Sequence, residues 1–200
     1  MSGEYRKLNE SEVRQFLTEH ETIENNNINE RCSIKHEMML IKEKQDAELY
    51  RPVDYSNPAV SKTNVISDPV YSACKNRLDG MDEKKMQYLQ QRLDQLDCQV
   101  HSLDRVCVAY GKTSMICPVA YYMLYELSYK HKEGRLKNWN ILAKELCRSK
   151  TSIKKGIDFI IHLVYLIYDS EYTTEELVNL DTEGLKKLLP EDILETAVKY

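Results

Sequence analysis

The sequence predicts an all-α protein: a helical bundle with a C-terminal helix-turn-helix and an appended acidic helical segment. Three observations predict this class. Apolar residues recur every three or four positions from 86 to 110. The same spacing returns from 138 to 168, on both sides of a short polar connection. Finally, residues 169–200 combine leucines at helical spacing with a Thr-x-x-Glu capping signal.

Composition limits the function. Of 200 residues, 42% are apolar and 30% charged, which suits one medium domain or two small ones. The six cysteines lack C-x-x-C spacing and the five histidines do not cluster near them, so we expect no metal site.

The start is too polar for a signal peptide, and the run 157–168 is too short to cross a membrane. Reduced thiols fit a cytoplasmic protein. Without a phosphate-binding glycine loop or a G-x-S-x-G motif, we expect neither a cofactor nor an enzyme.

Residues 1–50 predict an N-terminal helical arm. Asn9 and Glu12 form a capping signal for a first helix, the asparagine run 25–27 is expected to end it, and a second helix is expected over 30–49. The apolar residues on the inner faces are Val13, Phe16, Leu17, Ile34, Met38 and Ile41. The alternative is a weakly ordered arm. Two prolines and many small polar residues then predict a linker at 51–67.

Residues 68–168 predict the main helical domain. Pro69 suits a first helical turn, and Asp79–Gly80 is expected to end that short helix. A long helix is expected from 82 to 110, ended by Gly111. It carries an apolar seam with coiled-coil a/d spacing. The seam consists of Met86, Leu89, Leu93, Leu96, Val100, Leu103, Cys107 and Tyr110. We expect the seam to pack within the chain, with a homodimer through 86–110 as an open alternative.

Pro118 opens the next expected helix, which contains four tyrosines within nine residues. These are Tyr121, Tyr122, Tyr125 and Tyr129. Such rings can stack on exposed bases, but they are more often half-buried with their hydroxyls at the surface, and we expect the latter. A loop containing Gly134 is expected over 131–137.

The stretch 138–168 predicts the helix-turn-helix. Trp139, Leu142 and Leu146 recur at helical spacing before the connection, and the second helix continues the pattern from Ile153. Ser149 is a suitable N-cap for that second helix. Cys147 stands where the turn needs a residue with positive φ, so we expect some backbone strain there. The alternative is an ordinary pair of antiparallel helices without a DNA-binding role.

Charge favours the DNA-binding interpretation. From 130 to 155, nine Lys and Arg residues face two Glu, a local charge of +7 in a chain of net charge −4, so the remainder carries −11. A basic patch in an acidic protein suits phosphate contacts. The second helix is expected to present its first turns to the major groove of double-stranded DNA. The residues expected in this interface are Arg135, Lys137, Lys144, Arg148, Ser149, Lys150, Thr151, Ser152, Lys154 and Lys155. Of these, Arg135, Lys137, Lys144 and Arg148 are expected to hold phosphates.

The segment 169–200 is acidic, with nine Asp and Glu residues against three Lys. Thr173 and Glu176 predict a capping box, and Pro190 is expected to restart a last short helix. The inward residues of that last helix are expected to be Ile193, Leu194, Ala197 and Val198. Three roles remain open for this segment: it grips a protein partner, folds over the basic face as a DNA mimic, or shields the apolar end of the helix at 157–168.

The order of these features resembles phage-encoded transcriptional regulators of the RinA/ArpU type. The resemblance covers about 60–168 and rests on the Ser-Asp-Pro entry at 67–69, the long helix at 89–103, the tyrosine-bearing helix at 118–132, and the motifs 139–143 and 149–152. The last part is similar to region four of sigma factors. The resemblance implies control of promoters together with RNA polymerase.

Two alternatives belong to other classes. In the first, the protein is an interaction module that binds RNA polymerase or a host protein through the acidic segment and the 86–110 seam. In the second, it recognises DNA without regulating transcription, as the small subunit of a terminase does.

Overall fold

The computed structural model describes residues 7–49, 69–129 and 139–200. Within these ranges the protein contains eight α-helices, one π-helical turn and no strand, which confirms the predicted all-α class. The chain divides into two compact units. The core unit contains the residues up to 26 together with 98–200, and the coiled-coil unit contains 27–97. No helix in the described ranges is both long and apolar enough to cross a membrane.

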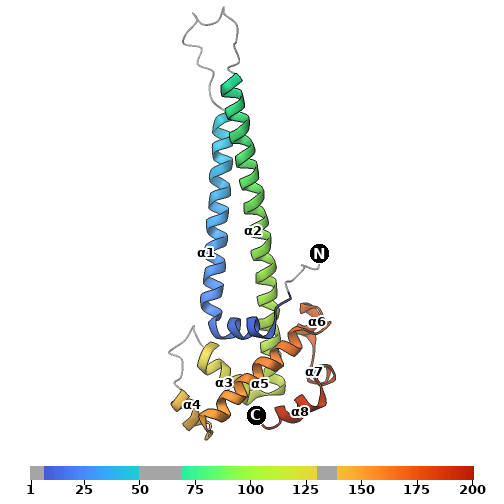
Figure 1. The fold of residues 1–200 in the computed structure, drawn as a ribbon. Coiled ribbons are helices and arrows are strands. Elements are labelled where there is room, and N and C mark those ends of the chain that lie inside the picture. The colour runs from blue at the N-terminus through green and yellow to red at the C-terminus, as the bar shows by residue number, and fades with distance from the viewer. Residues whose placement is uncertain (1–6, 50–68, 130–138) are drawn as a thin grey trace, which may run out of the picture. The chain divides into compact units, whose positions relative to one another are not determined.

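The coiled-coil unit consists of parts of two long helices, α1 (Glu10–Leu49) and α2 (Pro69–Ile116), which run side by side in opposite directions (Figure 1). Four side chains are buried between them, and three more pack against these. They are Ile34, Ile41, Leu89 and Leu96, with Met38, Met86 and Leu93. The predicted seam is therefore occupied from 86 to 96 by another helix of the same chain, as expected. A homodimer through this seam stays a prediction, without support in the structure.

Ion pairs flank this apolar contact. Their nitrogen–oxygen distances are 2.6 Å for Glu30–Arg92 and 2.6 Å for Glu37–Lys85, both at positions equivalent to g in the heptad. Lys44–Asp82 adds a third pair at 2.7 Å. Since these side chains are largely exposed, each pair stabilises the unit by less than about 1 kcal/mol. Together they favour the observed antiparallel register, because a shift of one heptad would leave only one Glu opposite a Lys or Arg among Glu30, Glu37, Lys85 and Arg92.

Three predicted helix ends are wrong. Helix α1 continues through the asparagine run 25–27 and is instead interrupted at Glu19, whose φ and ψ are −121° and 21°. Helix α2 continues through Gly80 and Gly111, and no described glycine has positive φ. An internal glycine costs about 1 kcal/mol and an asparagine less. Apolar burial elsewhere along these long helices, such as that of Ile34 in α1 and Leu89 in α2, outweighs such local costs.

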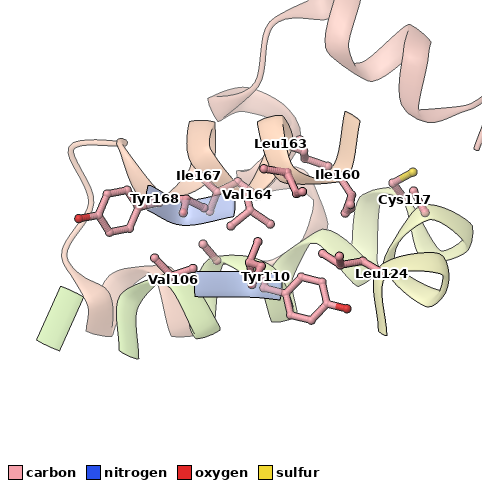
Figure 2. Close-up of a cluster of buried hydrophobic side chains, with 14 of the residues drawn as sticks. Val106, Tyr110, Cys117, Leu124, Ile160, Leu163, Val164, Ile167 and Tyr168 are labelled. Carbon is pink, nitrogen blue, oxygen red and sulfur yellow. The ribbon is translucent and has the colours of Figure 1, made fainter. Parts of the chain in front are cut away.

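The core unit is built around α5 (Lys150–Tyr168), which buries one face along most of its length. Helix α3 (Pro118–Leu124), continued by the π-helical turn η2 (Tyr125–Tyr129), packs along it. Figure 2 shows Val106 and Tyr110 of α2 facing Ile167 and Val164 of α5, with Leu124 of α3 facing Ile160. The start of α1 supplies Val13, Phe16 and Leu17 to the same cluster, as predicted. The second half of the predicted seam therefore also packs within the chain.

A buried arginine closes the C-terminal end of α5. Arg105 of α2 is fully buried. Its Nε donates to the carbonyl of Tyr168 and its Nη2 to that of Ser170, both at 2.8 Å, and its guanidinium lies 5.7 Å from the centre of the Tyr168 ring. The last carbonyls of a helix lack partners within the helix and carry the negative end of its dipole. Arg105 therefore satisfies them and places its charge where the dipole is favourable.

The acidic segment forms three short helices, α6 (Thr174–Asn179), α7 (Thr182–Leu188) and α8 (Glu191–Ala197). The predicted capping box is confirmed: Thr173 and Glu176 each accept a hydrogen bond from the other's backbone. The backbone N–H and the hydroxyl of Thr173 both donate to the Glu176 carboxylate and hold its pKa below the usual value. Lys112 of α2 donates to the carbonyls of Val178 and Leu180, at 2.6 and 2.7 Å.

The same segment adds four buried side chains to the apolar cluster of the core unit. They are Leu177, Leu185, Leu189 and Ala197. The segment is thus integral to the core unit, in agreement with the shielding role considered above. One inward residue was predicted wrongly: Val198 is 88% exposed, because α8 ends at Ala197 and the chain then turns. The predicted linker 51–67 and loop 131–137 lie outside the described residues.

The sequence-based division into an arm (1–50), a linker, a helical domain (68–168) and an acidic segment (169–200) differs from the two units found. Both long helices contribute to both units, which divide near 26/27 and 97/98. Linker composition does not detect such divisions, because each falls inside a continuous helix.

Candidate nucleic-acid interface

The candidate interface lies on α4 (Trp139–Glu145), the four-residue connection 146–149, and the first turns of α5. Leu142 of α4 and Ile153 of α5 are fully buried, and α4 packs against α5. The inner side of this helix pair is therefore apolar and closed, as the spacing predicts. Trp139 was expected on the inner face with Leu142, but it is 42% exposed. Its position in the first turn of a seven-residue helix puts it at the edge of the contact.

The connection is a Schellman-type helix end. The N–H of Arg148 donates to the carbonyl of Ala143 at 3.0 Å, and the N–H of Cys147 donates to that of Lys144 at 3.3 Å. Cys147 has φ 51°, the left-handed conformation that this end requires and that glycine adopts without strain. The strain expected from the sequence is thus present, and the turn forms despite it.

Replacing Cys147 by glycine is expected to stabilise the protein by about 0.5–1 kcal/mol, because the Cβ of a left-handed residue is removed. Urea denaturation followed by circular dichroism measures the change. Cys147→Ala is the matched control: it removes the sulfur but keeps the Cβ, so it should leave the stability close to that of the parent. Equal stabilisation by both substitutions would show that the backbone strain is not the cause.

Ser149 caps α5 as predicted. Its hydroxyl accepts a hydrogen bond of 3.1 Å from the N–H of Ser152. Since Ser149 remains exposed and its second lone pair is not used in this bond, it is still accessible at the rim of the interface. Ser152 itself is half-buried, which leaves it a smaller part of the surface than its neighbours.

Five expected interface residues lie exposed on the outer side of the helix pair. They are Lys144, Lys150, Thr151, Lys154 and Lys155. The four on α5 form two neighbouring pairs, Lys150 with Lys154 and Thr151 with Lys155, and the members of each pair lie one helical turn apart on the exposed side of the helix. In the described part of the chain, none of the four lysines in this set forms an ion pair or a side-chain hydrogen bond. They are Lys144, Lys150, Lys154 and Lys155. No ion pair described for segment 169–200 reaches them: its pairs join Asp169 to Lys7 and Glu183 to Lys186.

Arg148 has a different environment from these lysines. It is half-buried, its Nη2 donates to the carbonyl of Lys199 at 3.1 Å, and its guanidinium lies 5.4 Å from the centre of the Tyr200 ring. Within the core unit, Arg148 thus holds the residues after α8 against the start of α5. Its expected phosphate contact stays a prediction, and it competes with these bonds. Arg135 and Lys137 lie outside the described residues.

Tyr200 explains the glycine in α5. Its ring stacks on Phe159, with 5.7 Å between the centres, and lies against Gly156. A Cβ at Gly156 would come within 3.2 Å of the Tyr200 ring and 2.8 Å of the sulfur of Met123. The absence of a side chain at 156 therefore permits the close approach of both residues.

Two glycine substitutions are expected to have opposite effects on the free energy of unfolding. Gly156→Ala should destabilise the core unit by about 1 kcal/mol, because overpacking of about 1–3 kcal/mol exceeds the gain in helix propensity. Gly111→Ala should stabilise it by about 0.5–1 kcal/mol, since a Cβ there meets nothing within 4 Å. Thermal unfolding compares the two variants, and a stabilising Gly156→Ala would contradict the close packing of Tyr200.

The tyrosines of α3 and η2 form a separate stack. The ring centres of Tyr110 and Tyr121 are 4.6 Å apart, and those of Tyr121 and Tyr125 are 6.3 Å apart. Tyr121, Tyr122 and Tyr125 are half-buried, as expected, and burial raises the pKa of Tyr121. The side chain of Tyr129 is outside the described residues. Because these rings stack on one another, less of their aromatic surface is available for stacking with nucleic-acid bases.

No family model, curated protein or solved structure matches the chain. The function therefore has to be inferred from the surface itself. Within the described residues, no group of three His, Cys, Asp or Glu side chains is placed to hold a metal ion. The most specific chemical feature in the sequence-predicted region is the exposed lysine cluster of α4 and α5.

Proposed function

We propose that the protein is a sequence-specific DNA-binding regulator of transcription that uses α5 as its recognition helix. One observation carries the proposal: the four lysines at 144, 150, 154 and 155 project from the outer side of a helix pair whose inner side is fully buried. A surface of this kind offers cations at a fixed spacing on a rigid support.

The proposed docking follows from the chemistry of the groove. Lys150, Thr151 and Lys154 lie in the first turns of α5, the part of a recognition helix that reaches base edges. A lysine can donate to O6 and N7 of guanine, and a threonine methyl can contact the methyl group of thymine. Lys144 and Lys155 flank them and would hold phosphates, which sets the register of α5 in the groove.

Action at promoters together with RNA polymerase, and a phage origin, are part of the same proposal. They are supported only by the resemblance of residues 60–168 to RinA/ArpU-type regulators and to region four of sigma factors.

Selection from a pool of random duplexes tests the proposal. The full chain is incubated with the pool at about 0.1 M salt, bound DNA is recovered and sequenced, and affinity for an enriched duplex is measured against salt concentration. The two lysine–phosphate contacts assigned to Lys144 and Lys155 would give a slope of about −2 in log K against log salt. An enriched motif with such a slope supports specific recognition. Salt-dependent binding without a motif would reduce the proposal to nonspecific binding.

The absence of binding to any duplex would favour the interaction module instead. One observation gives that alternative a basis: Trp139 and Ile141 of α4 expose 42% and 51% of their surface. Large apolar side chains at the surface are frequent in protein interfaces. Under this alternative the lysines are an ordinary solvated face.

A further inference from the structure

A cysteine and a histidine meet in the core unit, away from the lysine cluster. The sulfur of Cys107 on α2 lies 3.6 Å from Nε2 of His20 on α1. The two residues are far apart in the sequence and are brought together because α1 bends at Glu19, immediately before His20. Both side chains are half-buried, so that the pair is packed but still reaches the surface.

Two neighbours orient the imidazole. The ring of Phe16, itself 2% exposed, lies 4.8 Å from the ring of His20 at an angle of 57°. On the other side, Nδ1 of His20 is 3.8 Å from a carboxylate oxygen of Glu24, one helical turn later. At this distance the carboxylate attracts a proton on Nδ1 through charge and not through a hydrogen bond, and in that tautomer Nε2 is an acceptor facing the thiol.

The other described cysteines have different surroundings. Cys32 and Cys147 are exposed, and Cys98 is half-buried like Cys107. Cys117 is buried, and burial raises its pKa. Among the cysteines whose side chains are described, Cys107 alone has a histidine nitrogen within hydrogen-bonding distance of its sulfur. A thiol of this kind loses its proton more readily, since the neighbouring base accepts it.

We propose that Cys107 is an activated thiol that exchanges with small disulfides in preference to the other described cysteines. His20 takes the thiol proton on Nε2, and the Cys107 thiolate attacks one sulfur of the small disulfide. A new sulfur–sulfur bond forms to Cys107 while the bond of the disulfide breaks. The leaving thiolate then takes the proton held on His20, so that one mixed disulfide and one small thiol are produced.

The modification would also affect the fold. Cys107 packs against the apolar cluster of the core unit, beside the first turns of α1. A bulky group on its sulfur has to displace part of that contact. We therefore expect the mixed disulfide to lower the melting temperature of the protein, and a reducing agent to restore it.

The experiment exposes the reduced full chain briefly to limiting oxidised glutathione at pH 6.5 and quantifies the modified peptides by mass spectrometry. Cys107 is expected to react about tenfold faster than Cys32, Cys98 and Cys147, and Cys117 slowest. At pH 9 the advantage of Cys107 should shrink, because hydroxide in the solvent then does the work of the neighbouring base.

Two variants separate the role of the base from that of packing. His20→Gln removes the base, and Glu24→Gln, at a half-exposed position, weakens it without disturbing the core. The first should reduce the pH 6.5 rate of Cys107 to that of the exposed cysteines, and the second should reduce it partly. The proposal is overturned if Cys107 reacts no faster than Cys147 at pH 6.5, or if both variants, folded by circular dichroism, leave its rate unchanged.

Discussion

Charge reversal at Lys150, Lys154 and Lys155 is expected to weaken the proposed DNA binding by a factor of about 10²–10⁴. Each lysine that contacts a phosphate or a base contributes about 1–2 kcal/mol, and a glutamate in its place adds repulsion from the DNA. The three side chains are exposed and form no ion pair in the described part of the chain, so the fold should be unaffected. Fluorescence anisotropy with a duplex recovered by selection measures the loss.

A matched control separates the site from the overall charge. Lys35, Lys42 and Lys84 are exposed in the coiled-coil unit, and their replacement by glutamate changes the net charge by the same amount. This control should lose only a small part of the affinity. Equal losses in the two triple variants would mean that the total charge of the protein, and not α5, determines binding.

Removal of Arg105 is expected to have the largest effect on stability. Arg105→Ala should lower the free energy of unfolding of the core unit by about 3–5 kcal/mol. The buried carbonyl of Tyr168 and the partly buried carbonyl of Ser170 would lose their charged donor, and the space of a fully buried side chain would be left empty. Urea denaturation followed by circular dichroism measures the change.

Two further substitutions make this prediction decisive. Arg14→Ala removes a 43% exposed guanidinium that pairs with Asp158 at 2.8 Å in the same unit, and it should cost less than about 1 kcal/mol. Arg105→Lys keeps the charge but cannot place two nitrogens on two carbonyls, so an intermediate loss is expected. A loss for Arg105→Ala no greater than that for Arg14→Ala would show that the carbonyls find other partners.

The features that the sequence predicts correctly depend on short-range interactions. Asn9 caps α1 with Glu12, Ser149 caps α5, and Thr173 caps α6 with Glu176, each through hydrogen bonds across three residues. Such bonds depend on side chains within one helical turn, so their residue types and spacing suffice to predict them. The positive φ of Cys147 belongs to the same class, because the turn geometry alone requires it.

Three of the errors concern helix length. The sequence predicts helix ends at Asn25–Asn27, Gly80 and Gly111, but each lies inside a helix. Local propensity differences of about 1 kcal/mol per residue are small compared with the apolar burial that a helix gains by continuing. Whether local propensity or apolar burial decides the helix end depends on the surface that the helix packs against, and the sequence alone does not show that surface.

Arg105 shows the same limit within the core. In the heptad register of the seam, position 105 falls on the side opposite Leu103 and Cys107, where a charged residue is usually exposed. It is fully buried because, in the core unit, α2 has neighbours beyond the seam, including the end of α5. The a/d pattern of the seam predicts which residues are buried only where the helix packs against a single partner helix.

The sequence by itself determined the all-α class, the helix caps, and the exposure of the lysines opposite Ile153, since each follows from helical periodicity or from bonds within a single turn. Only the tertiary structure decided that Arg148 is held by Lys199 and Tyr200, that Arg105 closes α5, and that His20 meets Cys107. These contacts join residues some fifty or more positions apart. The packing of whole helices determines which of these residues meet, and local sequence patterns do not contain that information.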